Sequence, residues 1–286
     1  MALFKTSFFS ECYQRLVPVN VLVPLDAPLL PGAVREPKRY KTLYLLHGYK
    51  GNCDDWLHNS LIARISEQFD LAVVMPDGAN GFYVDQPESN IHGSEFIGRE
   101  LIEFTRKTFS LSGLREDTVI AGLSMGGYGA FYNALKHSGV FGHAIPLSPP
   151  VKVIRYESEY EPEFVMSEFK QTDGYFKALH GDLKTVNESD RNLALFAKQT
   201  LESGQQIPNL YLACGYNDSL VPESRELHEQ LLAIGFPHVY EEGPGTHDWP
   251  FWNEFLRRGL VHALGEPDIP PHPFWVEKTD YERGRA

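Results

Sequence analysis

Ser124 lies at the centre of the pentapeptide Gly122-Leu123-Ser124-Met125-Gly126, and this spacing is the clearest chemical pattern in the chain. Residues 118–121 before it are β-branched or apolar, and apolar residues at helical spacing follow it. A strand, one sharp turn and a helix in this order force the serine into a strained conformation that exposes its hydroxyl. The flanking glycines leave room for that turn. The pattern predicts Ser124 as a nucleophile.

A serine hydroxyl needs a base to take its proton, and the base needs an acid to orient it. In a parallel α/β sheet, functional side chains gather beyond the carboxyl ends of the strands. Asp218 follows the predicted strand 209–214, and His247 follows the last predicted strand, 237–241. The order Ser124, Asp218, His247 is that of an α/β-hydrolase triad. We therefore predict His247 as the base and Asp218 as the acid.

Asp248 is the alternative acid, because it directly follows His247. A side chain in that position has difficulty reaching the ring of its own neighbour, so we expect Asp248 to stabilise the loop. The chain has 11 histidines, and a single one carries little information. We expect surface or capping roles for His92, His137, His180 and His238.

Two backbone N–H groups are candidates for an oxyanion hole. The N–H of Met125 opens the predicted helix after the serine, where a negative charge is favoured. The second donor is expected in the loop after the apolar run Thr42–Leu46, and there we select the N–H of Tyr49. His47 is expected to brace this loop.

Trp249 and Trp252 flank the predicted base and are expected to line a substrate pocket as an aromatic wall. Residues 151–190 are charged and aromatic with no clear strand, which interrupts the alternating pattern; the family resemblance described below implies that they form a small insert near the pocket. Acidic residues interrupt the apolar ones in this insert and disfavour contact with lipid. We expect a compact or planar acyl group as substrate.

Apolar runs and helical patterns alternate along the chain, which is typical of a parallel sheet covered on both faces. We predict an α/β-hydrolase fold with a mostly parallel eight-stranded sheet and an insert after the sixth strand. Residues 1–265 are assigned to one domain, with the insert at about 151–190. A proline-rich tail, 266–286, follows it.

The composition is that of an ordinary globular chain of 286 residues, 42% hydrophobic and 22% charged. A formal charge of −12 argues against nucleic acid or an anionic membrane as a partner. No apolar run is long enough to span a membrane, and no signal peptide is evident, so a cytoplasmic location is expected. Three scattered cysteines are too few for a zinc site or a disulfide framework, although a bond between Cys53 and Cys214 stays open.

Four motifs together resemble the esterase D-like α/β-hydrolases, and within them tributyrin esterases and feruloyl/acetyl-xylan carbohydrate esterases. These motifs are Leu45-Leu46-His47-Gly48, Met75-Pro76-Asp77-Gly78, Gly122-Leu123-Ser124-Met125-Gly126-Gly127 and Gly245-Thr246-His247-Asp248-Trp249. The segment 176–182 also looks like their insert. The resemblance implies ester hydrolysis through an acyl-serine intermediate, with no metal or cofactor and with Ser124, Asp218 and His247 as the triad.

The leading interpretation is a serine carboxylesterase for short-chain acyl or hydroxycinnamoyl (feruloyl) esters, including esters on plant polysaccharide fragments. Its partner would be a small-molecule or carbohydrate ester, and a homo-oligomer stays open. One alternative is a thioesterase like the S-formylglutathione hydrolases of the wider family, whose catalytic histidine usually precedes a Ser-Tyr-type sequence that this chain lacks. An acyltransferase and a non-catalytic binding protein of the same fold are the others.

Overall fold

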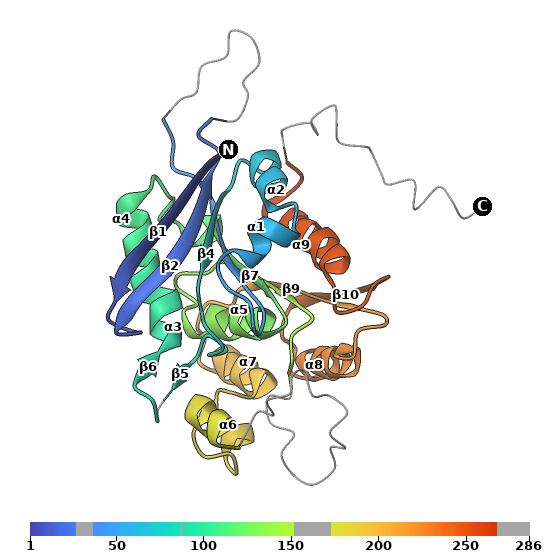
Figure 1. The fold of residues 1–286 in the computed structure, drawn as a ribbon. Helices are drawn as coiled ribbons and strands as arrows, with labels where there is room; N and C mark the ends of the chain where they lie inside the picture. Colours follow the sequence, from blue (N-terminus) through green and yellow to red (C-terminus); the bar gives the residue numbers. More distant parts are fainter. Residues whose placement is uncertain (27–36, 87, 152–172, 268–286) are drawn as a thin grey trace, which may run out of the picture.

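An eight-stranded sheet forms the centre of the computed structural model, which describes residues 1–26, 37–86, 88–151 and 173–267 (Figure 1). The strand order is β1-β2-β4-β3-β7-β8-β9-β10. The strands are β1 (Ala2–Ser10), β2 (Arg15–Val23), β3 (Thr42–Leu46), β4 (Ala72–Pro76), β7 (Thr118–Leu123), β8 (His143–Leu147), β9 (Asn209–Gly215) and β10 (His238–Gly243). Only the β1–β2 and β2–β4 pairs in this sheet are antiparallel, which confirms the predicted, mostly parallel eight-stranded sheet. A separate short hairpin joins β5 (Asp85–Gln86) and β6 (Ile91–His92).

Helices cover both faces of the sheet (Figure 1). One face carries α1 (Asp55–Asn59), α2 (Ile62–Gln68) and α9 (Trp249–Leu264). The other carries α4 (Leu101–Thr108), α5 (Met125–Lys136), α7 (Leu193–Glu202) and α8 (Val221–Ala233). Shorter helical pieces are α3 (Gly93–Glu95), the π-helical turn Phe96–Glu100, α6 (Asp173–His180) and the 3-10 turns Arg115–Asp117 and Val186–Glu188.

The two faces hold separate hydrophobic cores, because successive side chains of a strand point to opposite sides. In β3, Tyr44 belongs to the core under α4 and α5, whereas Leu43 and Leu45 belong to the core under α9. Every residue of β3, β4 and β7 is buried. This explains why these strands read as continuous apolar runs in the sequence.

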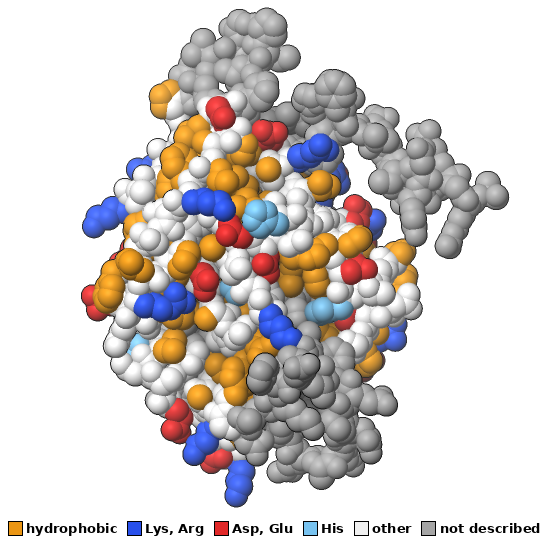
Figure 2. Space-filling model, in the orientation of Figure 1, with side chains coloured by type: hydrophobic (Ala, Val, Ile, Leu, Met, Phe, Trp, Pro, Cys, Tyr) orange, Lys and Arg blue, Asp and Glu red, His pale blue; other side chains and the backbone are white. Residues whose placement is uncertain are grey.

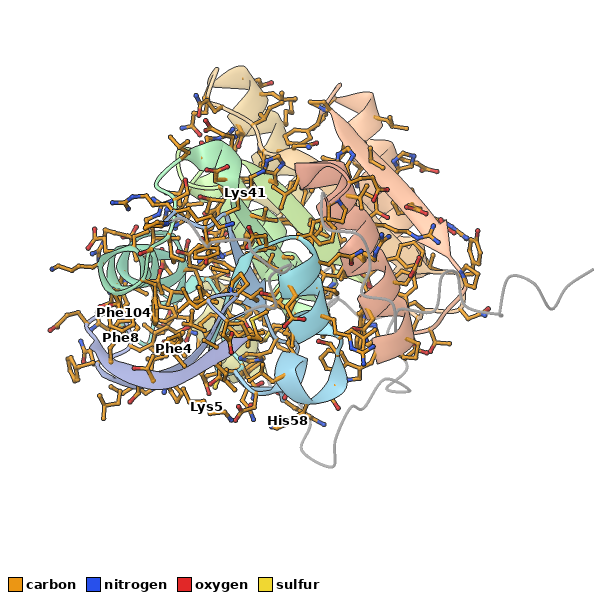
Figure 3. The ribbon with its side chains drawn as sticks, turned by 90° about the horizontal axis from the view of Figure 1, so that it is seen from above. Phe4, Lys5, Phe8, Lys41, His58 and Phe104 are labelled. Carbon is orange, nitrogen blue, oxygen red and sulfur yellow. The ribbon has the colours of Figure 1, made fainter. Side chains whose placement is uncertain are left out.

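The sheet ends at β1, whose outer face is covered only in part. Figure 3 shows Phe4 and Phe8 at the end of the sheet where β1 meets α4, which carries Phe104. The rings of Phe8 and Phe104 stack with their centroids 4.0 Å apart. Phe9 on the same strand is 57% exposed, so helix α4 covers this edge strand only in part.

Helix α9 begins at Trp249, two residues after His247. Asp248 caps its N-terminus, with Oδ1 accepting from the N–H of Phe251 at 3.1 Å, and Pro250 occupies the first turn. A proline is tolerated there because the N–H that it lacks would have no partner inside the helix. The helix therefore starts directly after the loop that carries His247.

Parts of the predicted insert and tail, residues 152–172 and 268–286, lie outside the described residues. All three cysteines are buried and free, so Cys53 and Cys214 are not bonded. Across the described ranges, no helix is both long and apolar enough to cross a bilayer. On the face seen in Figure 2, acidic and basic side chains are interspersed.

Candidate active site

Ser124 occupies the single residue between β7 and α5, in a left-handed backbone conformation with φ 52° and ψ −120°. Non-glycine residues rarely adopt this region, and they persist in it only where the surroundings fix them. Here the N–H of Ser124 donates to the carbonyl of Leu147 at 2.9 Å, and its carbonyl accepts from the N–H of Tyr128 at 3.0 Å. The predicted strand–turn–helix is therefore formed, with the serine at the carboxyl end of the central strand.

Close packing around the turn explains its glycines. A Cβ added to Gly126 would lie 2.5 Å from the carbonyl oxygen of Leu46 and 2.7 Å from that of His47. These are backbone atoms and cannot swing aside. The first turn of α5 therefore lies directly against the end of β3, which brings the loop after β3 next to Ser124.

Asp218 and His247 are joined by a hydrogen bond of 2.9 Å between Oδ2 and Nδ1. Their loops, which follow β9 and β10, are tied together because the N–H of Asn217 donates to the carbonyl of Gly245 at 3.1 Å. Asp218 is 3% exposed. Burial raises the pKa of its carboxyl, but hydrogen bonds from His247, Leu220 and Ser148 outweigh burial and hold the pKa below its usual value. The carboxylate is thus kept ionised and aimed at the imidazole.

Asp248 points away from this pair. Its Oδ2 accepts from the hydroxyl of Thr246 at 2.6 Å, while Oδ1 caps α9. The structure therefore confirms that Asp248 stabilises the loop and is not the hydrogen-bond partner of His247.

The two candidate oxyanion donors belong to two segments next to Ser124, the start of α5 and the loop after β3. Within the described part of the chain, neither the N–H of Met125 nor that of Tyr49 donates to a protein acceptor. Met125 is the first residue of α5, where the helix dipole favours a negative charge. A Cβ added to Gly48 would lie 3.7 Å from Cβ of Ser124, so the loop carrying Tyr49 is in van der Waals range of the serine.

His47 holds that loop in place, as expected. Its Nε2 accepts from the N–H of Gly78 at 2.9 Å, so its proton is on Nδ1, which lies 2.8 Å from the carbonyl oxygen of Gly48. Burial lowers the pKa of His47 and keeps the ring neutral. The hydroxyl of Tyr83 also donates to the carbonyl of His47 at 3.0 Å. His47 thus joins the loop after β3 to the loop after β4.

The two tryptophans of the predicted pocket both lie near His247. Trp252 is 6% exposed and meets the ring of His247 edge to face, with centroids 4.9 Å apart. Its Nε1 donates to Oγ of Ser148 at 3.2 Å. Trp249 is less buried and packs edge-on against Trp252 at 5.3 Å and Trp56 at 5.1 Å.

Ser148 is a residue of this site that the sequence reasoning did not select. It directly follows β8, is fully buried, and has φ 48°. Its N–H donates to the carbonyl of Ala213 in β9 at 2.8 Å. A polar residue just beyond a strand was the signal that selected Asp218 and His247, and the same signal would have found Ser148.

His180 corrects an expectation, because it is neither a surface nor a capping residue. Its side chain is 6% exposed, between Phe82 and Phe176, and both ring nitrogens lack a hydrogen-bond partner in the structure as described. Burial, followed by the charge of Arg191, lowers its pKa to about 3. The ring is buried because α6 packs this side against the body of the protein.

A mostly parallel sheet with a serine at the turn after a central strand, and an Asp–His pair beyond the last two strands, defines an α/β-hydrolase. The family model described as "Putative esterase" matches residues 27–263. The chain belongs to this esterase family and is an ester hydrolase. This confirms the resemblance seen in the motifs.

The chain is similar to several known esterases. It is 38% identical over 261 residues to an acetyl esterase of Caldicellulosiruptor saccharolyticus, which covers 90% of this chain and 96% of that protein. An S-formylglutathione hydrolase structure from Staphylococcus aureus aligns with a TM-score of 0.76 and 26% identity, over 92% of this chain and 98% of the other. A ferulic acid esterase structure aligns with a TM-score of 0.71, over 92% of this chain and 96% of the other. Its 20% identity makes that likeness one of fold.

In the described ranges, no three His, Cys, Asp or Glu side chains are grouped so that they could hold a metal ion. The candidate residues are instead those of nucleophilic catalysis: a hydroxyl, an imidazole, a carboxylate and two free backbone N–H groups.

Proposed function

We propose that the chain is a serine carboxylesterase in which Ser124, His247 and Asp218 act as a triad. The observation that carries this proposal is the hydrogen bond from Nδ1 of His247 to Asp218, at the same sheet edge as the strained Ser124. With Nδ1 donating to the carboxylate, the other ring nitrogen, Nε2, is left free to accept the serine proton.

In the first step, Oγ of Ser124 bonds to the ester carbonyl carbon while its proton passes to Nε2 of His247. The tetrahedral intermediate then collapses, the C–O bond to the alcohol breaks, and the alcohol leaves with that proton. In the second step, water attacks the acyl-serine with His247 again as base, which releases the carboxylic acid and restores the serine. Asp218 stabilises the imidazolium formed in each step.

The N–H groups of Tyr49 and Met125 are the proposed oxyanion hole. Among the described residues neither group donates to a protein acceptor, and they belong to the two segments next to the serine, the loop after β3 and the start of α5. Donors held ready in this way stabilise the developing negative charge without reorganisation, which is usually a large part of catalysis.

A short acyl ester is the proposed substrate, on a small molecule or a carbohydrate such as a plant polysaccharide fragment. The acetyl esterase at 38% identity over 90% of the chain supports the short acyl group. An aromatic wall beside His247 supports a compact or planar acyl group such as acetyl or feruloyl. In this wall we place Trp249 foremost, because Trp249 is partly exposed whereas Trp252 is buried.

The test of this proposal is Ser124→Ala, assayed with nitrophenyl acetate and with a fluorophosphonate probe. We expect turnover to fall by about three decades or more and probe labelling to disappear, because the triad acts as a unit. Ser110→Ala, an exposed serine whose side chain makes no hydrogen bond in the described part of the chain, is the matched control and should behave as the wild type. Turnover near the wild-type value in Ser124→Ala would remove the serine from the mechanism.

A second candidate is a thioesterase acting on S-formylglutathione or a similar thioester. The Staphylococcus aureus structure, at 26% identity and 98% coverage of that chain, favours it. The same triad would serve, with a thiol as the leaving group. The comparison of kcat/KM for S-formylglutathione and for nitrophenyl acetate decides between the two.

A further inference from the structure

Four side chains around the candidate base form a closed circuit of contacts. Nδ1 of His247 meets Oδ2 of Asp218 at 2.9 Å, and the ring of His247 meets the ring of Trp252 edge to face. The indole Nε1 of Trp252 donates to Oγ of Ser148 at 3.2 Å. The hydroxyl of Ser148 lies near enough to the Asp218 carboxylate to help lower its pKa, and it acts on the neighbouring Cys214 thiol in the same way. The circuit therefore links α9, the end of β8 and the loops after β9 and β10.

Three of the four side chains in the circuit are buried. Ser148 is 0% exposed, Asp218 is 3% exposed and Trp252 is 6% exposed. A buried indole N–H without an acceptor is unfavourable, and Ser148 is the acceptor that the structure offers it. The left-handed φ of 48° and the bond from its N–H to the carbonyl of Ala213 fix the backbone of Ser148 and thus the direction of its Cα–Cβ bond.

A serine hydroxyl has one proton and two lone pairs, so it can accept and donate at once. Since Nε1 of Trp252 can only donate, it occupies a lone pair of Ser148 Oγ. The proton of Ser148 is then left for the acceptors beside it, the Asp218 carboxylate and the Cys214 sulfur, of which the charged carboxylate is the stronger. The indole in the core thus restricts the directions in which this hydroxyl can donate.

We infer that Ser148 and Trp252 are positioning residues of the esterase reaction, which together hold Asp218 and the His247 ring in the catalytic geometry. Neither residue touches the substrate in this role. Trp252 supports the imidazole on one side through its ring and orients the acid on the other through Ser148. This inference rests on the proposed triad.

Three single variants test the circuit, together with the double variant that combines Ser148→Ala and Trp252→Phe. Ser148→Ala removes the hydroxyl, and Trp252→Phe keeps an aromatic ring against His247 but removes the N–H. Tyr44→Phe is the matched control, since it removes a hydrogen bond of 2.8 Å to Thr105 from a fully buried side chain in the opposite core. For each variant, kcat, KM and the thermal midpoint are measured.

We expect kcat to fall about tenfold in Ser148→Ala and in Trp252→Phe with KM within about twofold, because the reacting groups are misaligned while the pocket is kept. Tyr44→Phe should lower the thermal midpoint and leave kcat unchanged. The double variant should lose no more kcat than the worse single variant, since both substitutions break the same bond.

A spectroscopic readout separates this inference from the proposed function. The proton on Nδ1 of His247, hydrogen-bonded to Asp218, is observed by NMR without any substrate and in the Ser124→Ala background. We expect its resonance to move upfield in Ser148→Ala and Trp252→Phe and to stay in place in Tyr44→Phe. An unmoved resonance with normal kcat in Ser148→Ala overturns the circuit, as does additive loss in the double variant. Hydrolysis retained in Ser124→Ala would overturn the serine mechanism. The NMR measurement would still decide whether Ser148 and Trp252 position the His247–Asp218 pair, because it needs no turnover.

Discussion

Asp218 reaches His247 from 29 residues away with a 2.9 Å hydrogen bond, while Asp248, the residue directly after His247, bonds to Thr246 and Phe251 instead. The two carboxylates therefore perform different tasks. Asp218 belongs to the candidate site, and Asp248 starts a helix. This difference makes the assignment of the acid directly testable.

Asp218→Asn is expected to lower turnover at neutral pH by a factor on the order of 10⁴, because an amide can no longer hold the imidazole in the catalytic tautomer. Asp248→Asn should cost much less, since asparagine caps a helix about as well as aspartate does. Steady-state kinetics on both variants decide the matter. If the larger loss occurs in Asp248→Asn, the acid has been misassigned.

Gly126→Ala should damage both stability and activity, because its new Cβ would lie 2.5 Å from the carbonyl oxygen of Leu46. Either α5 or the loop after β3 must shift, and a shift of about 1 Å in a catalytic group can cost about a hundredfold in rate. Gly113→Ala is the control, because no atom lies within 4 Å of its Cβ. Its free energy of unfolding in urea should stay within about 0.5 kcal/mol of the wild type. Equal behaviour of the two variants would contradict the close packing at the serine turn.

His180 should make the protein lose stability in mild acid. Its pKa is about 3 in the folded protein, against about 6.5 in the unfolded chain, so between these values the unfolded state binds the extra proton. The free energy of unfolding therefore does not depend on His180 above about pH 6.5. Below that pH it falls by up to about 1.4 kcal/mol per pH unit, because the unfolded chain takes up the proton that the buried ring excludes.

His180→Leu removes the titrating ring and should flatten this dependence. Urea unfolding at several pH values between 7 and about 4.5 measures it. His92→Gln, at an exposed position, should follow the wild-type curve. Parallel curves for the wild type and His180→Leu would show that another group controls the acid sensitivity.

Acyl chain length is the last prediction. We expect the highest kcat/KM for acetyl to butyryl esters, cleavage of methyl ferulate, and a steep fall by about ten carbons, because the proposed pocket is a compact aromatic wall. The acidic residues of the insert that also motivate this prediction lie mainly at 152–172, outside the described residues. An acyl series measured below micelle formation tests it. A rise toward dodecanoyl with activation at an oil–water interface would indicate a lipase.

Most of the fold could be predicted from the sequence, because the information is local. A strand buried on both faces must be apolar throughout, so β3, β4 and β7 stand out in the chain. The turn at Ser124 is equally local, since a strand, two glycines and a helix are contiguous there. Given the fold, the order of the chain also placed Asp218 and His247 at the same edge of the sheet.

Tertiary structure decided the relationships between distant residues. Nothing in the sequence around Trp252 indicates that its indole N–H bonds to Ser148, 104 residues away, and no periodicity separates a buried His180 from an exposed one. Hydrogen bonds of this kind depend on the direction of each side chain after the helices have packed. The sequence by itself therefore determined the strands, the serine turn and the residue types of the site. Packing of α9 and α6 onto the body of the protein determined which of those residues touch, because contact between distant side chains exists only once the helices are in place.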